Sequence, residues 1–438
     1  MSIYSIARWF WYASGLRAAK LWVKYNVTNA EWKRLQRSGN TRSWAAQTGA
    51  SPTALIIPPD PLLLIASKGD EAMITCVISA IRQDNENARI VIATCGEGAD
   101  AKARQMGLEP CRILDEGSLS RSAERMSSVS PTHVFTIGAD VLDGSYDPDF
   151  SLRLLALTDL AARKGAVCSV TGFSFSKKPY RALAKAYSSA SRSIVFRLRD
   201  RRSFERFREF CSARAELVAD VAFLLKPDPH SARTNDLRSW ITERRAEGQK
   251  VIGLNFHPLL LPPVRRGELP SFVASLADSI SSLIANANCS VVLLAHDFRG
   301  TSADHHCLGP LYDSLQRSVP GRVFNADEEF SASELKGLVG ALDGVISGRM
   351  HLAIASLGMG TPVFAFSYKD KMEGLLMHFA LSESMMVMID DVKNRTKFDQ
   401  LLGSFVSELD GVRRSVADSL PTVKALAKKN LQPSPAET

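Results

Sequence analysis

The side chains best suited to chemistry are gathered in one stretch of the sequence, between Asp343 and Leu376. An apolar run, predicted as a buried strand, leads there into Ser347-Gly348-Arg349-Met350-His351 at the start of a predicted helix. Unpaired backbone N–H groups and the positive end of the helix dipole favour an anion at such a position. The Arg349 guanidinium can bind a carboxylate or phosphate through two hydrogen bonds, and the His351 imidazole can transfer a proton near neutral pH. We therefore predict that Arg349 and His351 are catalytic residues acting on an anionic substrate.

A second group of cations surrounds another predicted strand. Seven arginines lie between Arg192 and Arg208, a density that is also found in nucleic-acid-binding proteins. Acidic residues interleave with them, so we interpret most of these arginines as a solvated helix face and predict no nucleic-acid partner. Arg199 is the exception, because it ends a strand, where parallel sheets bind their ligands.

Two further clusters carry only weak signals. Gly96-Glu97-Gly98 follows a strand but lacks the third glycine of a dinucleotide fingerprint. The run from Asp304 to Cys307 contains metal-ligand types, yet adjacent residues on a helix do not share a face. We therefore predict no metal and no nucleotide cofactor.

The segments that must position these side chains alternate short apolar runs with helix-period stretches, which is typical of βαβ units. A polar, proline-containing linker over residues 226–237 separates two such series. The strands predicted on either side of this linker cover residues 61–66, 89–94, 133–137, 166–170 and 194–198, then 250–255, 290–295, 322–324, 344–346 and 362–366. We therefore predict an α/β fold with two Rossmann-like domains facing each other across a cleft.

The expected domain boundaries follow from these series. They are an N-terminal helical extension, a first domain, a second domain, and a C-terminal helix with its tail, over residues 1–55, 56–228, 229–392 and 393–438. A chain of 438 residues with 45% hydrophobic and 23% charged residues can bury two cores. The net charge of +8 favours anionic partners. The seven cysteines contain no CxxC pair, which indicates a reducing, intracellular location.

The N-terminal extension holds five of the six tryptophans, within the first 44 residues. Its apolar run is interrupted by Arg8, Arg17, Lys20 and Lys24, so we predict no transmembrane helix. A basic edge beside Trp9, Phe10 and other apolar side chains suits a helix lying in a membrane interface. A helix docked on the protein's own surface explains the pattern equally well, and both interpretations stay open.

The motifs of the second domain resemble those of the polysaccharide pyruvyl transferases. The resemblance rests on Ser347-Gly348-Arg349-Met350-His351, on Gly360-Thr361-Pro362, and on Tyr368-Lys369-Asp370-Lys371, whose lysine stands twenty residues after the histidine. Looser matches are Gly69-Asp70-Glu71-Ala72, Arg199-Asp200 with Ser203, and Asp220-Val221-Ala222-Phe223. Lys68 and the turn from Gly138 to Gly144 depart from the family pattern, and both lie in the first domain.

The resemblance implies a GT-B-like architecture, with the acceptor in the first domain and the donor in the second. It also implies that a pyruvyl group moves from phosphoenolpyruvate onto sugar hydroxyls of a polysaccharide or its precursor, which forms a ketal and releases phosphate. On this basis His351 and Arg349 are the expected catalytic residues. The expected substrate-binding residues are Arg199, Lys371, Tyr368, Ser347, Gly69 and Asp70.

No cofactor is expected in this scheme, because phosphoenolpyruvate is itself the donor substrate. The acceptor is expected to be a glycan or a lipid-linked glycan. A cytoplasmic location follows from the donor, with peripheral contact to the inner membrane face through the N-terminal segment as one expectation. Two alternatives share the fold, namely a GT-B nucleotide-sugar glycosyltransferase and a non-catalytic glycan-binding or anion-binding protein.

Overall fold

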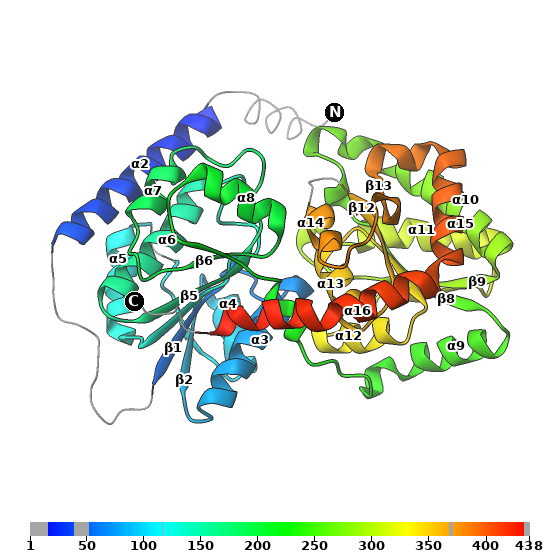
Figure 1. Ribbon diagram of the computed structural model, residues 1–438, viewed down its shortest axis with the longest axis horizontal. Helices are drawn as coiled ribbons and strands as arrows, with labels where there is room; N and C mark the ends of the chain where they lie inside the picture. The colour runs from blue at the N-terminus through cyan, green and yellow to red at the C-terminus, as the bar shows by residue number, and fades with distance from the viewer. Residues whose placement is uncertain (1–15, 39–51, 116, 368–370, 433–438) are drawn as a thin grey trace. The chain divides into compact units, whose positions relative to one another are not determined.

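The computed structural model describes residues 16–38, 52–115, 117–367 and 371–432. These residues form two compact units. The first comprises the described residues up to Leu64, Val77–Val218 and the chain from Asn430 onward, and the second comprises Ile65–Cys76 and Ala219–Lys429. Each unit is built on a parallel sheet (Figure 1). The predicted fold class, α/β with two Rossmann-like domains, is confirmed.

The described sheet of the first unit has the strand order β3-β2-β1-β4-β5-β6-β7, and every neighbouring pair is parallel. Its strands are β1 Thr53–Ile57, β2 Arg89–Ala93, β3 Glu109–Cys111, β4 His133–Thr136, β5 Val167–Phe173, β6 Phe196–Leu198 and β7 Ala215–Leu217. Its helices are α2 Leu16–Arg37, α4 Glu97–Gln105, α5 Leu119–Val129, α6 Pro148–Arg163, α7 Leu183–Ser189 and α8 Arg201–Phe210. The helix α3 (Lys68–Asp84) begins in the second unit and ends in the first.

The described sheet of the second unit has the order β10-β9-β8-β11-β12-β13 and is also parallel. Its strands are β8 Lys250–Asn255, β9 Cys289–Leu294, β10 Val323–Ala326, β11 Gly344–Ser347, β12 Val363–Ser367 and β13 Met386–Met388. Its helices are α9 Asn235–Ala246, α10 Leu269–Ala287, α11 His305–Ser318, α12 Ala332–Gly340, α13 Met350–Gly358, α14 Lys371–Met377, α15 Arg395–Ser407 and α16 Leu409–Lys428. The strand order reverses between β8 and β11, and such a switch point is where open parallel sheets bind ligands.

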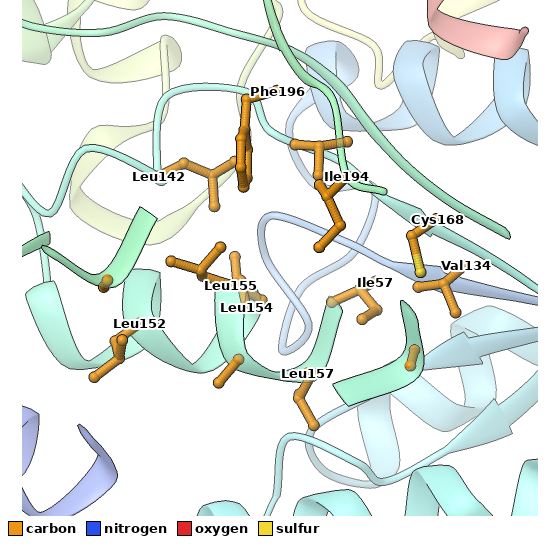
Figure 2. Packing of buried hydrophobic residues seen from close by; sticks show 14 of the residues in the cluster. Ile57, Val134, Leu142, Leu152, Leu154, Leu155, Leu157, Cys168, Ile194 and Phe196 are labelled. Atoms are coloured by element: carbon orange, nitrogen blue, oxygen red, sulfur yellow. The ribbon is translucent and has the colours of Figure 1, made fainter. Parts of the chain in front are cut away.

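The core of the first unit forms where α6 covers its sheet. Leucines of α6, among them Leu152, Leu155 and Leu157, pack with strand residues such as Val134 and Phe196 (Figure 2). These side chains are almost completely buried. The near-continuous apolar runs that revealed the strands are therefore the buried sides of this layer.

The helix α2 docks on the first unit through one face. Trp32 is 1% exposed, and its indole Nε1 donates to Asp159 Oδ2 of α6 at 2.9 Å. Tyr25 packs edge-on against Tyr180, with 5.0 Å between the ring centroids. The docked interpretation is therefore correct for that face of α2. Trp9 and Phe10, on which the membrane interpretation rests, lie outside the described residues. Among the described helices, none is long and apolar enough to cross a membrane.

The first predicted strand, at residues 61–66, is wrong. These residues form a turn, in which the Asp60 carboxylate accepts hydrogen bonds from the backbone N–H groups of Leu62 and Leu63. The strand is β1, which begins at Thr53 inside the segment expected to be helical. Its residues Thr-Ala-Leu-Ile-Ile precede Pro58 and Pro59, and prolines cannot continue a central strand.

The units also exchange segments that the expected boundaries keep together. Residues 65–76, expected in the first domain, belong to the second unit, and the main division falls after Val218 rather than after Asp228. The chain returns to the first unit at Asn430, whose Oδ1 accepts from the Gly172 N–H at 2.6 Å. A β-carbon at Gly172 would lie 3.2 Å from that oxygen, so this close approach favours glycine.

Candidate active site

The candidate site lies at the switch point of the second sheet. The ends of β8 and β11 pair there, with Asn255 in register with Ser347. The chain leaves β8 toward His257 and leaves β11 toward Arg349 and His351. Titratable side chains therefore follow directly on the two strands that flank the reversal of strand order.

The turn after β11 is fixed by hydrogen bonds within itself. The buried Ser347 hydroxyl accepts from the Arg349 N–H at 3.1 Å and donates to the Arg349 carbonyl at 2.9 Å. Arg349 is the N-cap residue of α13, with extended backbone angles, so its side chain leaves the helix start. The two hydrogen bonds of the Ser347 hydroxyl thus stabilise the turn that carries Arg349.

A buried histidine supports the same turn from β8. The Nδ1 of His257 accepts from the Leu259 N–H at 3.2 Å, which makes Nε2 the protonated nitrogen that donates to the Gly348 carbonyl at 2.9 Å. A β-carbon at Gly348 would lie 2.8 Å from the His257 ring, so only glycine fits there. Burial, and then the charge of Arg349, hold the pKa of His257 well below its ordinary value.

The Arg349 guanidinium is held by two buried aspartates. Its Nε and Nη2 donate to Asp304 Oδ1 at 3.0 and 2.6 Å, Nη2 also donates to the Ser302 carbonyl at 2.7 Å, and Nη1 lies 3.0 Å from Asp297 Oδ2. The other oxygen of Asp304 accepts from Asn255 Nδ2 at 2.7 Å. Because both carboxylate oxygens of Asp304 face N–H donors, this side chain fixes the orientation of the guanidinium.

The electrostatics of the two aspartates differ. Complete burial raises the pKa of Asp304, and the Arg349 guanidinium opposes that rise. Burial also acts against the ionised form of Asp297, but its bonds to Arg299 and the charge of Arg349 outweigh burial and lower its pKa. His296, which follows β9, is fully buried beside His351, Arg349 and Lys68, and its pKa lies well below the ordinary value, first because of burial and then because of these charges.

The imidazole of His351 is placed between two residues that are distant in sequence. Its Nε2 is buried and has no hydrogen-bond partner within the described residues, and Asp220 Oδ2 lies 3.5 Å away. On the other side, a β-carbon at Gly69 would lie 2.2 Å from His351 Nδ1. The ring therefore packs directly against the backbone of the first turn of α3, which only a glycine allows.

The segment carrying Asp220 is itself anchored. Asp220 Oδ1 accepts from the Ala222 N–H at 2.9 Å and so caps the short helix η1 (Val221–Leu224). Lys336 of α12 is 2% exposed, and its Nζ donates to the Phe223 carbonyl at 2.9 Å. Burial lowers the pKa of Lys336 to about 8. A buried lysine thus ties η1 to α12 and keeps Asp220 beside His351.

The first turn of α3 adds charged residues to this site. Asp70 Oδ2 lies 3.7 Å from Arg299 Nη1, and Arg299 in turn binds Asp297. The buried Lys68 pairs with Glu71 at 3.0 Å and with Glu329 at 2.8 Å. The structure therefore brings Gly69 and Asp70 together with Arg349 and His351, within one unit.

Three predicted site residues lie elsewhere or outside the described chain. Arg199 belongs to the first unit, where it is 3% exposed and its Nε donates to Ser174 Oγ at 2.8 Å. Lys371 is the first residue of α14. Tyr368 lies outside the described residues. The predicted substrate contacts of Arg199, Lys371 and Tyr368 stay predictions.

The sequence analysis did not assign His257, Asp297 or Arg299 to the site. A usable signal existed, because His257 follows the predicted strand at 250–255 and Asp297 follows the one at 290–295. Searching for titratable residues after these two strands, as was done after the strand at 344–346, finds both.

Solved structures with a similar fold define the class of this protein. They include a putative UDP-N-acetylglucosamine 2-epimerase from Listeria monocytogenes (10% identity, TM-score 0.55, covering 87% of this chain and 95% of that chain) and a glycosyltransferase from Rickettsia africae (12%, 0.53, 87% and 99%). A trehalose 6-phosphate synthase from Burkholderia multivorans is similar as well (10%, 0.51, 87% and 98%). At such low identity the likeness concerns the fold alone, which is the GT-B-like arrangement of two parallel-sheet domains.

The family model for polysaccharide pyruvyl transferase matches residues 68–370, which is most of the chain. No curated protein sequence matches this chain. The chain belongs to the polysaccharide pyruvyl transferase family, and the expectation drawn from its motifs is confirmed.

Proposed function

We propose that this protein transfers the pyruvyl group of phosphoenolpyruvate to two hydroxyls of a sugar in a glycan or lipid-linked glycan, forming a cyclic ketal and releasing phosphate. Membership of the family supports a transferase that acts in polysaccharide synthesis. The observation that carries the proposal is the placement of His351 at the sheet's switch point, between Gly69 and Asp220. A proton-transfer group at a ligand-binding edge is what the donor's chemistry requires.

The proposed reaction moves one proton to the donor and one proton away from each sugar hydroxyl. Protonation of the donor at C3 makes C2 electrophilic, and a sugar hydroxyl attacks C2 and loses its proton. Phosphate then departs, and a second hydroxyl attacks C2 to close the ketal. His351 delivers the proton to C3 and accepts one from the first attacking hydroxyl, so it ends the cycle in its starting state. The proton of the second hydroxyl is taken up by the released phosphate. Asp220, whose Oδ2 lies 3.5 Å from Nε2, keeps the ring in position for these transfers.

The anionic groups of the donor need cations, and we propose Arg349 with Lys371 and Arg199. Asp304 holds Nε and Nη2 of the Arg349 guanidinium, whereas Asp297 faces Nη1. A carboxylate or phosphate of the donor can therefore replace Asp297 at Nη1 without turning the guanidinium. Asp297 keeps Arg299 as its partner when this happens.

Phosphate release from phosphoenolpyruvate by the purified chain, measured against a panel of saccharides, tests the proposal. We expect release that depends on one class of acceptor, and a product whose mass increases by one pyruvyl ketal. The His305→Ala variant, which changes an exposed histidine of α11, serves as control and should behave as the native chain. Release without an acceptor, or transfer from a nucleotide sugar instead, would reject the proposal.

A further inference from the structure

The helix α2 has two apolar faces, and the described part of the protein covers only one of them. Tyr25 and Trp32 face α6 and are buried. Val23 and Val27 lie on the opposite face and are 52% and 54% exposed, and Trp22, on the flank between the two faces, is 60% exposed. A helix that only docks on its own protein needs one apolar face, so docking explains Trp32 and leaves Trp22 unexplained.

The charges of α2 follow the same division. Lys24, Lys33 and Arg37 are exposed, and Arg34 is exposed while it donates to Ser120 Oγ at 2.9 Å. The sole acidic residue in the sequence of this helix is Glu31, and it is turned toward α5, where its carboxylate accepts from Ser118 Oγ and the Ser120 N–H. The exposed face is therefore cationic, and no carboxylate of the helix competes for its partner.

The apolar and basic side chains of the exposed face are ordered around the helix. At 3.6 residues per turn, Val23, Val27 and Ala30 form a stripe. Lys24 stands on one side of this stripe, and Lys33 and Arg37 stand on the other. Arg34 continues the line of the stripe toward the end of the helix. Apolar side chains with cations on both sides match the boundary of a bilayer, where acyl chains lie beneath anionic headgroups.

We propose that the exposed face of α2, formed by Trp22, Val23, Val27, Lys24, Lys33 and Arg37, binds the surface of a membrane that contains anionic lipids. The helix lies parallel to the bilayer, with the apolar stripe at the level of the upper acyl chains and the cations among the phosphates. Lipid binding by this face is independent of the transferase site, and it holds the first unit at the surface.

Co-sedimentation of the full chain with vesicles tests this proposal. The vesicles are phosphatidylcholine alone or phosphatidylcholine with phosphatidylglycerol, each at low and high salt. We expect sedimentation with the anionic vesicles only, weakened by salt. Sedimentation with both vesicle types to the same extent would overturn the proposal.

Two sets of substitutions connect the binding to this face. The combined variant Lys24→Glu, Lys33→Glu, Arg37→Glu should lower the partition coefficient more than about tenfold, since each cation near the surface contributes about fivefold. The combined variant Trp22→Ser, Val23→Ser, Val27→Ser should lower it by a similar factor. All six side chains are exposed, so both variants should keep the native circular dichroism and phosphate release in solution.

Matched controls exclude general effects of charge and polarity. The combined variant Arg317→Glu, Arg414→Glu, Lys428→Glu changes three exposed cations of the second unit, and Val264→Ser changes a valine that is 85% exposed. Both should sediment as the native chain does. Unchanged vesicle binding in the α2 variants would overturn the proposal. If these variants lost self-association of the chain instead of vesicle binding, the proposal would also be overturned, because the face would then bind a second copy.

Discussion

The two sheets differ in the segments that follow the strands at their switch points. In the first unit, β1 leads into Pro58-Pro59-Asp60, where Asp60 closes a turn, and β4 leads into Gly138-Ala139, where Ala139 has a φ of 45°. In the second unit, the corresponding strands lead to His257, Arg349 and His351. One edge is built to turn the chain sharply, and the other is built to hold ionisable groups in fixed positions. The same fold thus carries tight turns at one switch point and buried ionisable groups at the other.

The largest expected effect tests whether turnover depends on His351, at the edge of the second sheet. We expect His351→Ala to lower kcat by about 100-fold or more with a modest change in the KM for phosphoenolpyruvate, because the proton-transfer group is lost and the anion-binding groups remain. Steady-state phosphate release measures both constants. Near-native turnover would remove His351 from the mechanism, and His305→Ala supplies the control.

The second prediction concerns the glycine on which the His351 ring rests. We expect Gly69→Ala to lower kcat by about 50-fold, because a β-carbon 2.2 Å from Nδ1 must displace the ring. Gly98→Ala is the matched control, since it stands in the first turn of another helix after a strand and has nothing within 4 Å of an added β-carbon. Equal activity of the two variants would show that the ring position is unimportant.

Arg349 tests whether geometry or charge matters at this edge. We expect Arg349→Lys to lower kcat/KM by about 20-fold, because a single ammonium nitrogen cannot reach the separate positions from which Nε, Nη1 and Nη2 contact Asp304, Asp297 and the Ser302 carbonyl. The control Arg245→Lys changes an exposed partner of Asp343 and should have little effect. If the lysine variant retained full activity, the planar geometry of the Arg349 guanidinium would have no role.

Asp220 is expected to act through His351. Asp220→Asn keeps the oxygen that caps η1 but removes the charge, so we expect kcat to fall by about tenfold while the thermal stability changes little. The limb of the kcat–pH profile that reports His351 should move as well. Asp147→Asn, at the N-cap of α6, is the control for capping alone. A loss of stability without a shift of the profile would make Asp220 purely structural.

The smallest effect is a pH dependence of stability caused by Lys336. The unfolded lysine keeps its proton up to about pH 10.5, whereas the buried one loses it near pH 8, first because of burial, with Cys76 and Lys424 acting in opposite directions. Between these values the unfolded chain binds more protons, so the free energy of unfolding should rise by about 1 kcal/mol from pH 8 to pH 9. Denaturant titrations of the native chain and Lys336→Met should show this rise in the native chain alone, and Lys428→Met should retain it.

Much of the second unit could be predicted from the sequence. The bounds predicted for β8 agree with the structure, and those for β9, β11 and β12 differ by a residue at one or both ends, because buried parallel strands are continuous apolar runs. The three-residue strands β3 and β7 have no such run and were missed, and β13 was missed although Met385 to Ile389 are all apolar. The true first strand, β1, was missed because the leucines of residues 61–66 imitate a strand, although Leu62 and Leu63 are largely exposed.

The candidate site was predictable where its residues belong to motifs. Arg349 and His351 share one motif, and Gly69 and Asp70 share another, so the sequence analysis assigned all four to the site. The pairing of Arg349 with Asp297 and Asp304 required knowing where β9 and α11 lie, which no local pattern contains. The assignment of Gly69 to the second unit likewise depends on a helix, α3, that is divided between the units.

The return of the chain at Asn430 has a consequence for biosynthesis. Asn430 and Gln432 accept hydrogen bonds from Gly172, Ser169 and Arg197, which belong to the strand region of the first unit. Domains usually fold in the order in which they leave the ribosome. Here the N-terminal unit cannot be completed until the last helix has been translated, so the unit that begins first is the one that is finished last.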